Sequence, residues 1–275
     1  MSSIESTLVG EDLHLGYQSY TVSQGISVSI PKGKFTVIIG PNGCGKSTLL
    51  KSLCRLITPK QGQVLLDGKS IHNMPTKQVA KAIGLLPQTA TAPEGIRVFD
   101  LVSRGRFPHQ GVFKQWSEED QRATVEALSS TGTLEFADRG VDQLSGGQRQ
   151  RVWIAMALAQ ETPILMLDEP TTYLDITHQF DLLDLFRSIN LEQNRTLVAV
   201  LHDLNQACRY ADHIIAMKQG KVVAEGSPKS LITESLIKEV FEVDCVVIPD
   251  PLSGSPLVIP KSRHDSDGLS SVSAD

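Results

Sequence analysis

The sequence predicts an α/β fold with a parallel sheet, and three features indicate it. Residues 35–39 are almost uniformly apolar and lead through a glycine-rich loop into a helical stretch over residues 47–56. A buried strand, a tight loop and a helix in this order open a parallel sheet. Two later apolar strands, 164–167 and 196–201, are each followed by polar residues. Ligands bind at such strand ends in open parallel sheets, so functional residues are expected there.

Smaller elements flank these strands in the order of the chain. The alternating residues Ser27-Val28-Ser29-Ile30 predict a half-buried strand, and Pro31-Lys32-Gly33-Lys34 predicts a turn after it. Near the other end of the core, Lys218-Gln219-Gly220-Lys221 predicts a hairpin turn.

The chain changes character at about residue 89. Glycines and prolines mark an irregular stretch, and Ser117-Glu118-Glu119-Asp120 is typical of a helix start, because acidic residues stabilise the first turn. Residues 117–160 have a mostly helical pattern. We therefore expect an α/β core over about 1–88 and 161–245, a helical insertion over about 89–160, an extension over 246–260 and a disordered polar tail over 261–275.

Composition and charge limit the classes of function. The 275 residues are 40% hydrophobic and 21% charged, which is ordinary for a globular protein with a sizeable core. A net charge of −5 provides no basic field, so no nucleic-acid partner is expected. The longest apolar run covers residues 152–159, whereas a membrane-spanning helix needs about 20 apolar residues. The four cysteines lack metal-site spacing, so we expect neither a zinc site nor a disulfide framework.

The loop after the first core strand has the pattern of a phosphate-binding loop. Gly40-Pro-Asn-Gly-Cys-Gly-Lys-Ser47 fits GxxxxGK[ST] between a predicted strand and a predicted helix. Its glycines allow backbone N–H groups to surround an anion, and the helix N-terminus adds a positive dipole. Lys46 can reach terminal phosphates, and the Ser47 hydroxyl can bind Mg²⁺. The residues expected to hold a nucleotide here are Gly40, Pro41, Asn42, Gly43, Cys44, Gly45, Lys46, Ser47 and Thr48.

Two carboxylates follow the second core strand. Asp168 and Glu169 come directly after the apolar residues 164–167. We expect Asp168 to lie beside the phosphate-binding loop and to hold Mg²⁺ through water. Glu169 would orient and polarise the attacking water, because the first carboxylate is occupied by the metal.

A third motif completes a family pattern. Leu144-Ser-Gly-Gly-Gln148 precedes a predicted helix and presents a hydroxyl and backbone N–H groups at its start. With this motif, the sequence over about residues 8–245 resembles the ATP-binding cassette (ABC) family. The resemblance also matches four single residues in the family's order, namely Tyr17, Gln88, Asp175 and His202.

The resemblance implies roles for these residues. Tyr17 would stack on adenine, and Gln88, after the third core strand, would contact the metal and the reaction centre. His202 would contact the γ-phosphate as the switch histidine, and Asp175 belongs to the loop after the acidic pair. The catalytic residues implied are therefore Glu169, His202 and Gln88, and the metal-binding residues are Ser47, Gln88 and Asp168.

The resemblance further implies a fold, a reaction and a dimer. The fold would be a RecA-like phosphate-loop core with an N-terminal antiparallel β subdomain and an inserted helical subdomain. The protein would be an ATPase that uses ATP and Mg²⁺. Two cassettes would pack head to tail, so that Ser145, Gly147 and Gln148 act on the nucleotide held by the partner chain.

Several stretches are similar to one importer group within the family. Leu-Leu-Pro-Gln (85–88), Leu-Val-Ser-Arg-Gly-Arg-Phe-Pro (101–108) and His-Asp-Leu-Asn-Gln-Ala (202–207) resemble ATPases that import ferric siderophores, haem or cobalamin. The similarity is greatest to ferric citrate and other ferric siderophore importers. It implies two separate membrane permease subunits, an extracytoplasmic siderophore-binding protein, and a peripheral position at the cytoplasmic face of the inner membrane.

Two alternatives stay open at this point. The same cassette could serve haem or cobalamin import, because the cargo never touches this subunit. A soluble ABC ATPase of iron–sulfur cluster assembly would share every catalytic motif. It would differ from an importer subunit in binding soluble scaffold proteins and not a membrane permease.

Overall fold

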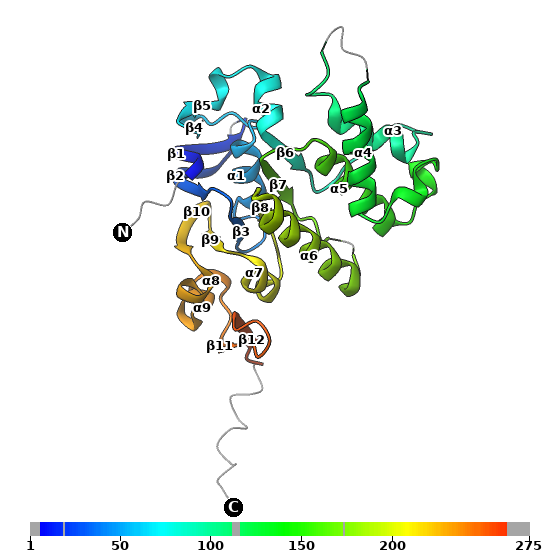
Figure 1. Ribbon diagram of the computed structural model, residues 1–275. Helices are drawn as coiled ribbons and strands as arrows, with labels where there is room; N and C mark the ends of the chain where they lie inside the picture. The colour runs from blue at the N-terminus through cyan, green and yellow to red at the C-terminus, as the bar shows by residue number, and fades with distance from the viewer. Residues whose placement is uncertain (1–5, 19, 112–115, 173, 263–275) are drawn as a thin grey trace, which may run out of the picture.

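A computed structural model describes residues 6–18, 20–111, 116–172 and 174–262. Figure 1 shows three regions: strands of the N-terminal part beside a central sheet, a group of helices projecting to one side, and a short C-terminal hairpin at the opposite end. All of the expected tail after residue 262 lies outside the described residues. In the described part, no helix combines the length and the apolar character needed to cross a bilayer.

The central sheet is parallel except at one edge, as the sequence predicts. Its strand order is β10-β9-β3-β8-β7-β6. Five strands run parallel and β10 pairs antiparallel with β9. Every residue of β3, β7 and β8 is buried, which explains their nearly continuous apolar sequences. The bounds are β3 Phe35–Ile39, β6 Ile83–Leu86, β7 Ile164–Asp168, β8 Thr196–Val200, β9 His213–Lys218 and β10 Lys221–Gly226.

A second, antiparallel sheet is formed by the N-terminal part. Its order is β2-β1-β4-β5, with β1 Ser6–Tyr17, β2 Tyr20–Pro31, β4 Gln61–Leu66 and β5 Lys69–Ser70. Helix α1 (Lys46–Leu53) shares one apolar core with this sheet and with the central sheet. Leu49 and Leu53 of α1 are fully buried in that core. The phosphate-binding loop at the start of α1 is therefore fixed between two sheets.

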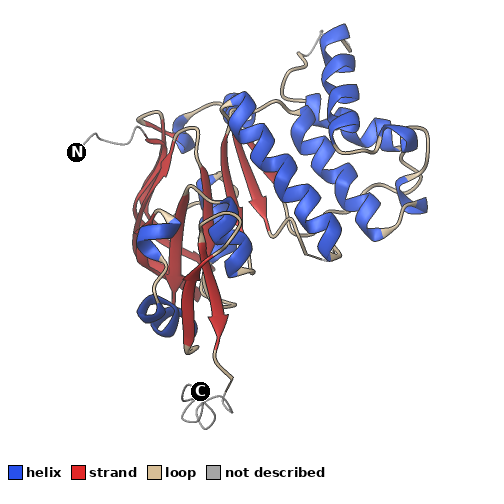
Figure 2. Cartoon of the chain, turned by 60° about the horizontal axis from the view of Figure 1, so that its bottom comes forward, coloured by secondary structure: helices blue, strands red, loops and turns tan. Residues whose placement is uncertain are grey.

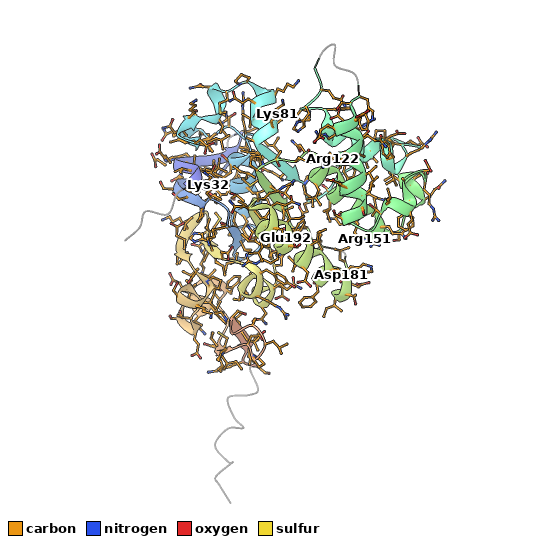
Figure 3. The ribbon with its side chains drawn as sticks, in the orientation of Figure 1. Lys32, Lys81, Arg122, Arg151, Asp181 and Glu192 are labelled. Carbon is orange, nitrogen blue, oxygen red and sulfur yellow. The ribbon has the colours of Figure 1, made fainter. Side chains whose placement is uncertain are left out.

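The inserted region is helical, as expected for residues 117–160. It contains α3 (Val98–Ser103), α4 (Glu118–Ser130) and α5 (Gly146–Ala159), and it projects beside the strands in Figure 2. The expected start at Ser117 is confirmed, because its hydroxyl accepts from the Asp120 amide and the Asp120 carboxylate accepts from the Ser117 amide. Figure 3 labels Arg122 and Arg151 in this region.

The remaining helices connect or follow the strands. The longest is α6, which lies between β7 and β8, and α7 lies between β8 and β9. Their bounds are α2 Thr76–Ala82, α6 Ile176–Gln193, α7 Leu204–Tyr210, α8 Pro228–Leu231 and α9 Glu234–Phe241, with 3₁₀ turns at 71–73, 104–106, 134–136 and 141–143.

The extension after residue 245 has structure that the sequence analysis did not predict. Strands β11 (Cys245–Pro249) and β12 (Pro256–Pro260) pair as a hairpin. The Asn205 side chain of α7 binds the backbone of Val258 twice, donating at 3.2 Å and accepting at 2.8 Å. The hairpin is therefore bound to the helix that follows β8.

One buried arginine joins the helices of the inserted region. Arg106 is 2% exposed. Its Nε donates to Asp120 Oδ1 at 3.0 Å, and its Nη1 donates to the Ala159 carbonyl at 2.8 Å and to Glu161 Oε2 at 2.6 Å. The guanidinium thus connects the first turn of α4 to the end of α5.

Replacing this arginine should destabilise the protein. Arg106→Met keeps the apolar stem but leaves the buried Asp120 carboxylate without its charge partner, so the free energy of unfolding should fall by about 3–5 kcal/mol. Urea denaturation followed by circular dichroism measures the change. Arg104→Met, at an exposed position in the same 3₁₀ turn, is the matched control. Equal unfolding free energies for the two variants would contradict the role of Arg106.

Candidate functional site

The phosphate-binding loop connects β3 to α1 and depends on backbone conformations that favour glycine. Gly40 has a φ of 151°, and a Cβ there would lie 2.2 Å from the Met217 carbonyl oxygen. Gly45, the residue before α1, has a φ of 103°. Any larger side chain at Gly40 would force the loop away from β9, so the glycine is required by close packing.

Lys46 is directed into the loop. Its Nζ donates to the carbonyl oxygens of Gly40 at 2.8 Å and Pro41 at 2.9 Å, and the residue is buried. The ammonium group therefore lies inside the concave backbone, at the position where an anion would contact both.

Ser47 and Asp168 meet across the gap between α1 and β7. The Ser47 hydroxyl donates to Asp168 Oδ1 at 2.7 Å. Asp168 is fully buried, and its Oδ2 has no hydrogen-bond partner among the described residues. The Lys51 ammonium lies 3.6 Å from that oxygen. A buried carboxylate oxygen that has one ammonium group nearby and no hydrogen bond can still accept a further ligand.

Glu169 is held between two side chains that come from other strands. Its Oε2 accepts from Gln88 Nε2 at 2.7 Å, and its Oε1 lies 2.8 Å from His202 Nε2. Glu169 itself has a φ of 53°, a left-handed conformation that costs energy for a residue with a Cβ. The sharp turn after β7 directs this carboxylate toward the strand ends of β6 and β8.

Most of these residues line one cavity of about 390 Å³, although Asp168 is not among its described lining residues. Its wall combines the loop and first turn of α1 with the polar residues that follow β6, β7 and β8. The lining residues are Tyr20, Val22, Asn42, Gly43, Gly45, Lys46, Ser47, Thr48, Gln88, Glu169 and His202.

The aromatic at the cavity mouth differs from the one that the sequence indicated. Tyr20 lines the cavity, as does Val22, whereas Tyr17 is not among the lining residues. Tyr17 and Tyr20 are paired at the turn end of the β1–β2 hairpin, and both are exposed. Their proximity in the sequence could not distinguish them, because the two residues are directly paired and only the position of the hairpin beside the phosphate-binding loop decides which one lines the cavity.

Three other residues of the loop support it without lining the cavity. Gly40 and Pro41 supply the carbonyl groups that bind Lys46. Cys44 is buried, and burial raises the pKa of its thiol despite the nearby Lys46 charge. Its backbone carbonyl accepts from the Gly220 amide at 3.0 Å, so the loop is also attached to the β9–β10 turn.

The Ser145 motif lies apart from this cavity. Ser145 caps α5, with its hydroxyl accepting from the Gln148 amide at 3.3 Å and its own amide donating to Gln148 Oε1 at 3.0 Å. Ser145 and Gly146 are exposed, and a Cβ at Gly146 would meet nothing within 4 Å. At Gly147 a Cβ would be 3.6 Å from Leu174, which is ordinary contact. The packing of this chain does not require either glycine.

Asp175 also lies outside the cavity. It caps α6 and accepts from the His178 amide at 2.9 Å, and its carboxylate is 2.7 Å from His178 Nδ1. These two hydrogen bonds lower the pKa of Asp175. Within one chain the cavity thus contains Gln88, Glu169 and His202, while Asp175 and the Ser145 motif remain on a separate, exposed surface.

Comparison with known proteins agrees with this geometry. The family model described as ABC transporter matches residues 23–172. The ferric enterobactin transport ATP-binding protein FepC of Escherichia coli is 56% identical over 96% of this chain and 97% of its own length. The probable siderophore transport ATP-binding protein YusV of Bacillus subtilis is 54% identical, covering 94% of each chain. The iron(3+)-hydroxamate import protein FhuC of the same species is 49% identical over 92% of this chain and 94% of its own.

Solved structures have the same fold. A chain of an ABC transporter in an inward-facing conformation superposes with a TM-score of 0.80 at 28% identity, covering 94% of this chain and 99% of its own. The cassette MJ0796, solved as a dimer, gives a TM-score of 0.72 at 30% identity, covering 80% and 98%. The predicted fold class and the predicted resemblance are both confirmed. The chain is therefore an ATP-binding protein of the ABC transporter family.

Proposed function

We propose that this chain is the ATP-hydrolysing subunit of a membrane importer for ferric siderophores. The cargo is inferred from the three relatives described above. They align over nearly the whole chain, and their names refer to transport of ferric enterobactin, a siderophore and iron(3+)-hydroxamate. The observation that carries the reaction is the cavity in which Lys46, Ser47 and Glu169 converge.

The nucleotide is bound mainly by the loop and the start of α1. The backbone N–H groups of residues 42–48 surround the phosphates, and Lys46 exchanges its two carbonyl partners for terminal phosphate oxygens. An aromatic ring of the β1–β2 hairpin stacks on adenine. We predict Tyr17 for this role from the resemblance, while the position of Tyr20 at the cavity favours the neighbouring ring.

The residues between α1 and β7 fit a Mg²⁺ ion. The Ser47 hydroxyl is a hard oxygen ligand of the kind this ion prefers, the unpartnered Asp168 Oδ2 can accept from a water bound to the ion, and the Gln88 amide lines the same cavity as Ser47. When bound, the ion neutralises charge on the phosphate oxygens. Ser47 and Asp168 would hold it, with Asp168 acting through water.

Three side chains perform the hydrolytic step. Glu169 accepts a hydrogen bond from the attacking water and orients it toward the γ-phosphate. Gln88 and His202 already contact the two oxygens of this carboxylate, so they fix its direction before ATP arrives. His202 then turns its Nε2 toward the γ-phosphate, where developing negative charge is stabilised.

A second copy of the chain completes each site. The exposed cap at Ser145, with its two adjacent glycines, has the chemistry of an anion-binding helix start and lies outside the described lining of the cavity in its own chain. Ser145, Gly147 and Gln148 therefore contact ATP held by the partner, and Asp175 contacts the partner near its phosphate-binding loop. Two ATP molecules lie in the dimer interface.

The dimer transmits its opening and closing to other subunits. It binds two permease subunits at the inner face of the membrane, where it is a peripheral protein, and the permease receives cargo from an extracytoplasmic siderophore-binding protein. No nucleic acid takes part.

Removing the general base should nearly stop hydrolysis. Glu169→Gln preserves shape but loses the carboxylate that polarises water, so kcat for ATP hydrolysis should fall about 10²–10³-fold. A phosphate-release assay at saturating ATP measures it. Glu192→Gln, on the exposed end of α6 labelled in Figure 3, is the control and should retain wild-type turnover. Near wild-type turnover in Glu169→Gln would refute the assignment of the base.

Removing Mg²⁺ should also abolish activity. Chelation by EDTA removes the ion, and added Mg²⁺ should restore hydrolysis. Asp168→Asn should raise the Mg²⁺ concentration for half-maximal rate by about tenfold or more, the loss expected when a charged outer-shell partner of the ion is removed. Asp181→Asn, at an exposed position of α6, should leave it unchanged. An unaltered Mg²⁺ requirement in Asp168→Asn would contradict its role.

Iron uptake tests the cargo. Iron-starved cells that lack the endogenous copy are given radiolabelled iron as a panel of siderophores and carry either the wild-type chain or Glu169→Gln. We expect uptake of at least one ferric siderophore to collapse with the variant. Unchanged uptake with both chains, after other iron importers have been deleted, would exclude iron, and haem and cobalamin would be tested next.

A further inference from the structure

Two loops that carry site residues are connected by a pair of glutamine side chains. Gln179, in the first turns of α6, donates from Nε2 to the Leu174 carbonyl at 3.0 Å. Its Oε1 accepts from Gln206 Nε2, in the first turn of α7, at 2.8 Å. Leu174 directly precedes Asp175, and Gln206 lies four residues after His202.

The direction of this chain of hydrogen bonds is fixed by chemistry. A backbone carbonyl can only accept, so the Gln179 amide must direct its nitrogen toward Leu174 and its oxygen toward Gln206. The Gln206 amide must then present its nitrogen. Gln206 is 7% exposed, so an unpaired amide group at this position would be costly.

Both ends of the pair lie beside aspartate caps. Asp175 caps α6 through the His178 amide, and Asp203 caps α7 by accepting from the Gln206 amide at 2.9 Å. Asp203 directly follows His202. Each loop is therefore held to its own helix by a cap, and the glutamines hold the two capped loops to each other.

Helices α6 and α7 are joined further along their length. The Arg209 guanidinium lies 5.7 Å from the centre of the Phe180 ring, and the Tyr210 hydroxyl donates to Asp184 Oδ1 at 2.7 Å. With the glutamine pair, these contacts make three connections between the helices. A displacement of the loop at Leu174 is thus carried by the pair of helices together.

Leu174 also contacts the region of the Ser145 motif. Its side chain is buried in the core that includes Leu144, and Gly147 lies beside it. Leu174 is therefore in a position to respond to a movement of the helical subdomain relative to the central sheet.

We propose that Gln179 and Gln206 are positioning residues that hold His202 in register with the Asp175 loop and the Ser145 motif of the same chain. The proposal rests on the proposed ATPase function. Closure of a dimer onto Asp175 and Ser145 would reposition Leu174, and the glutamine pair would carry that shift to the first turn of α7 and to His202. Neither glutamine lines the nucleotide cavity, so the pair acts on the rate of hydrolysis and not on ATP binding.

A double-mutant cycle tests the pair in the full chain with ATP and Mg²⁺. Gln179→Met and Gln206→Met preserve length and remove the amides. Each should lower kcat about tenfold, the size of one ordinary pairwise coupling, with KM for ATP within about twofold of wild type. The double variant should be no slower than either single variant, because one connection is lost in all three. Gln193→Met, at the exposed far end of α6, is the control.

The glutamine relay, meaning the coupling of Leu174 to His202 through Gln179 and Gln206, can fail while the proposed function stands. Single variants with wild-type kcat, a double variant whose loss is the product of the single losses, or a raised KM with unchanged kcat would each overturn the relay. Melting temperatures within a few degrees of the control would exclude general destabilisation as the cause of a lower kcat. If Gln206→Met does not fold, Gln206→Asn keeps the amide but shortens its reach and takes its place. A wild-type chain that does not hydrolyse ATP, or a fully active Glu169→Gln, would overturn the proposed function itself and the relay with it.

Discussion

The parallel, in-register pairing of β6, β7, β8 and β3 is the constraint on which the site depends. It brings the ends of these strands to one edge, so that Gln88, Glu169 and His202 meet although they are far apart in the sequence. Because alternate residues of a strand point to opposite faces, a slip of one residue in β7 would move Asp168 away from Ser47. The complete burial of β7 and β8 between two apolar cores makes such a slip costly.

Backbone conformations that are unfavourable for most residues occur at this edge of the sheet. Glu169 adopts a left-handed backbone conformation directly after β7, and Gly40 accepts a contact with β9 that a side chain would forbid. Both features are tolerated because the surrounding sheet is buried on both faces. The consequence is a carboxylate and an anion-binding loop that are aligned before any ligand is present.

The inserted helices contribute less directly to the site than the strands of the sheet do. They have their own buried network around Arg106 and contribute the exposed cap at Ser145, but none of their described residues lines the cavity. Their links to the core run through the segment after β7, where Gln150 donates to the Pro170 carbonyl at 3.1 Å and Leu174 packs beside Gly147. The surface that we propose to bind phosphate in a partner is thereby attached to the loop that follows Glu169.

The fold class, the phosphate-binding loop and the polar strand ends could be predicted from the sequence, because these depend on local periodicity and on short motifs. Continuous apolar runs predicted the buried strands, and the capping pattern predicted the start of α4 at Ser117. The tertiary structure was needed to choose between Tyr17 and Tyr20, because the two are directly paired and only the position of the hairpin beside the phosphate-binding loop separates them. It also decided the C-terminal hairpin and the Gln179–Gln206 contact, since these join residues whose separation in sequence carries no periodic signal.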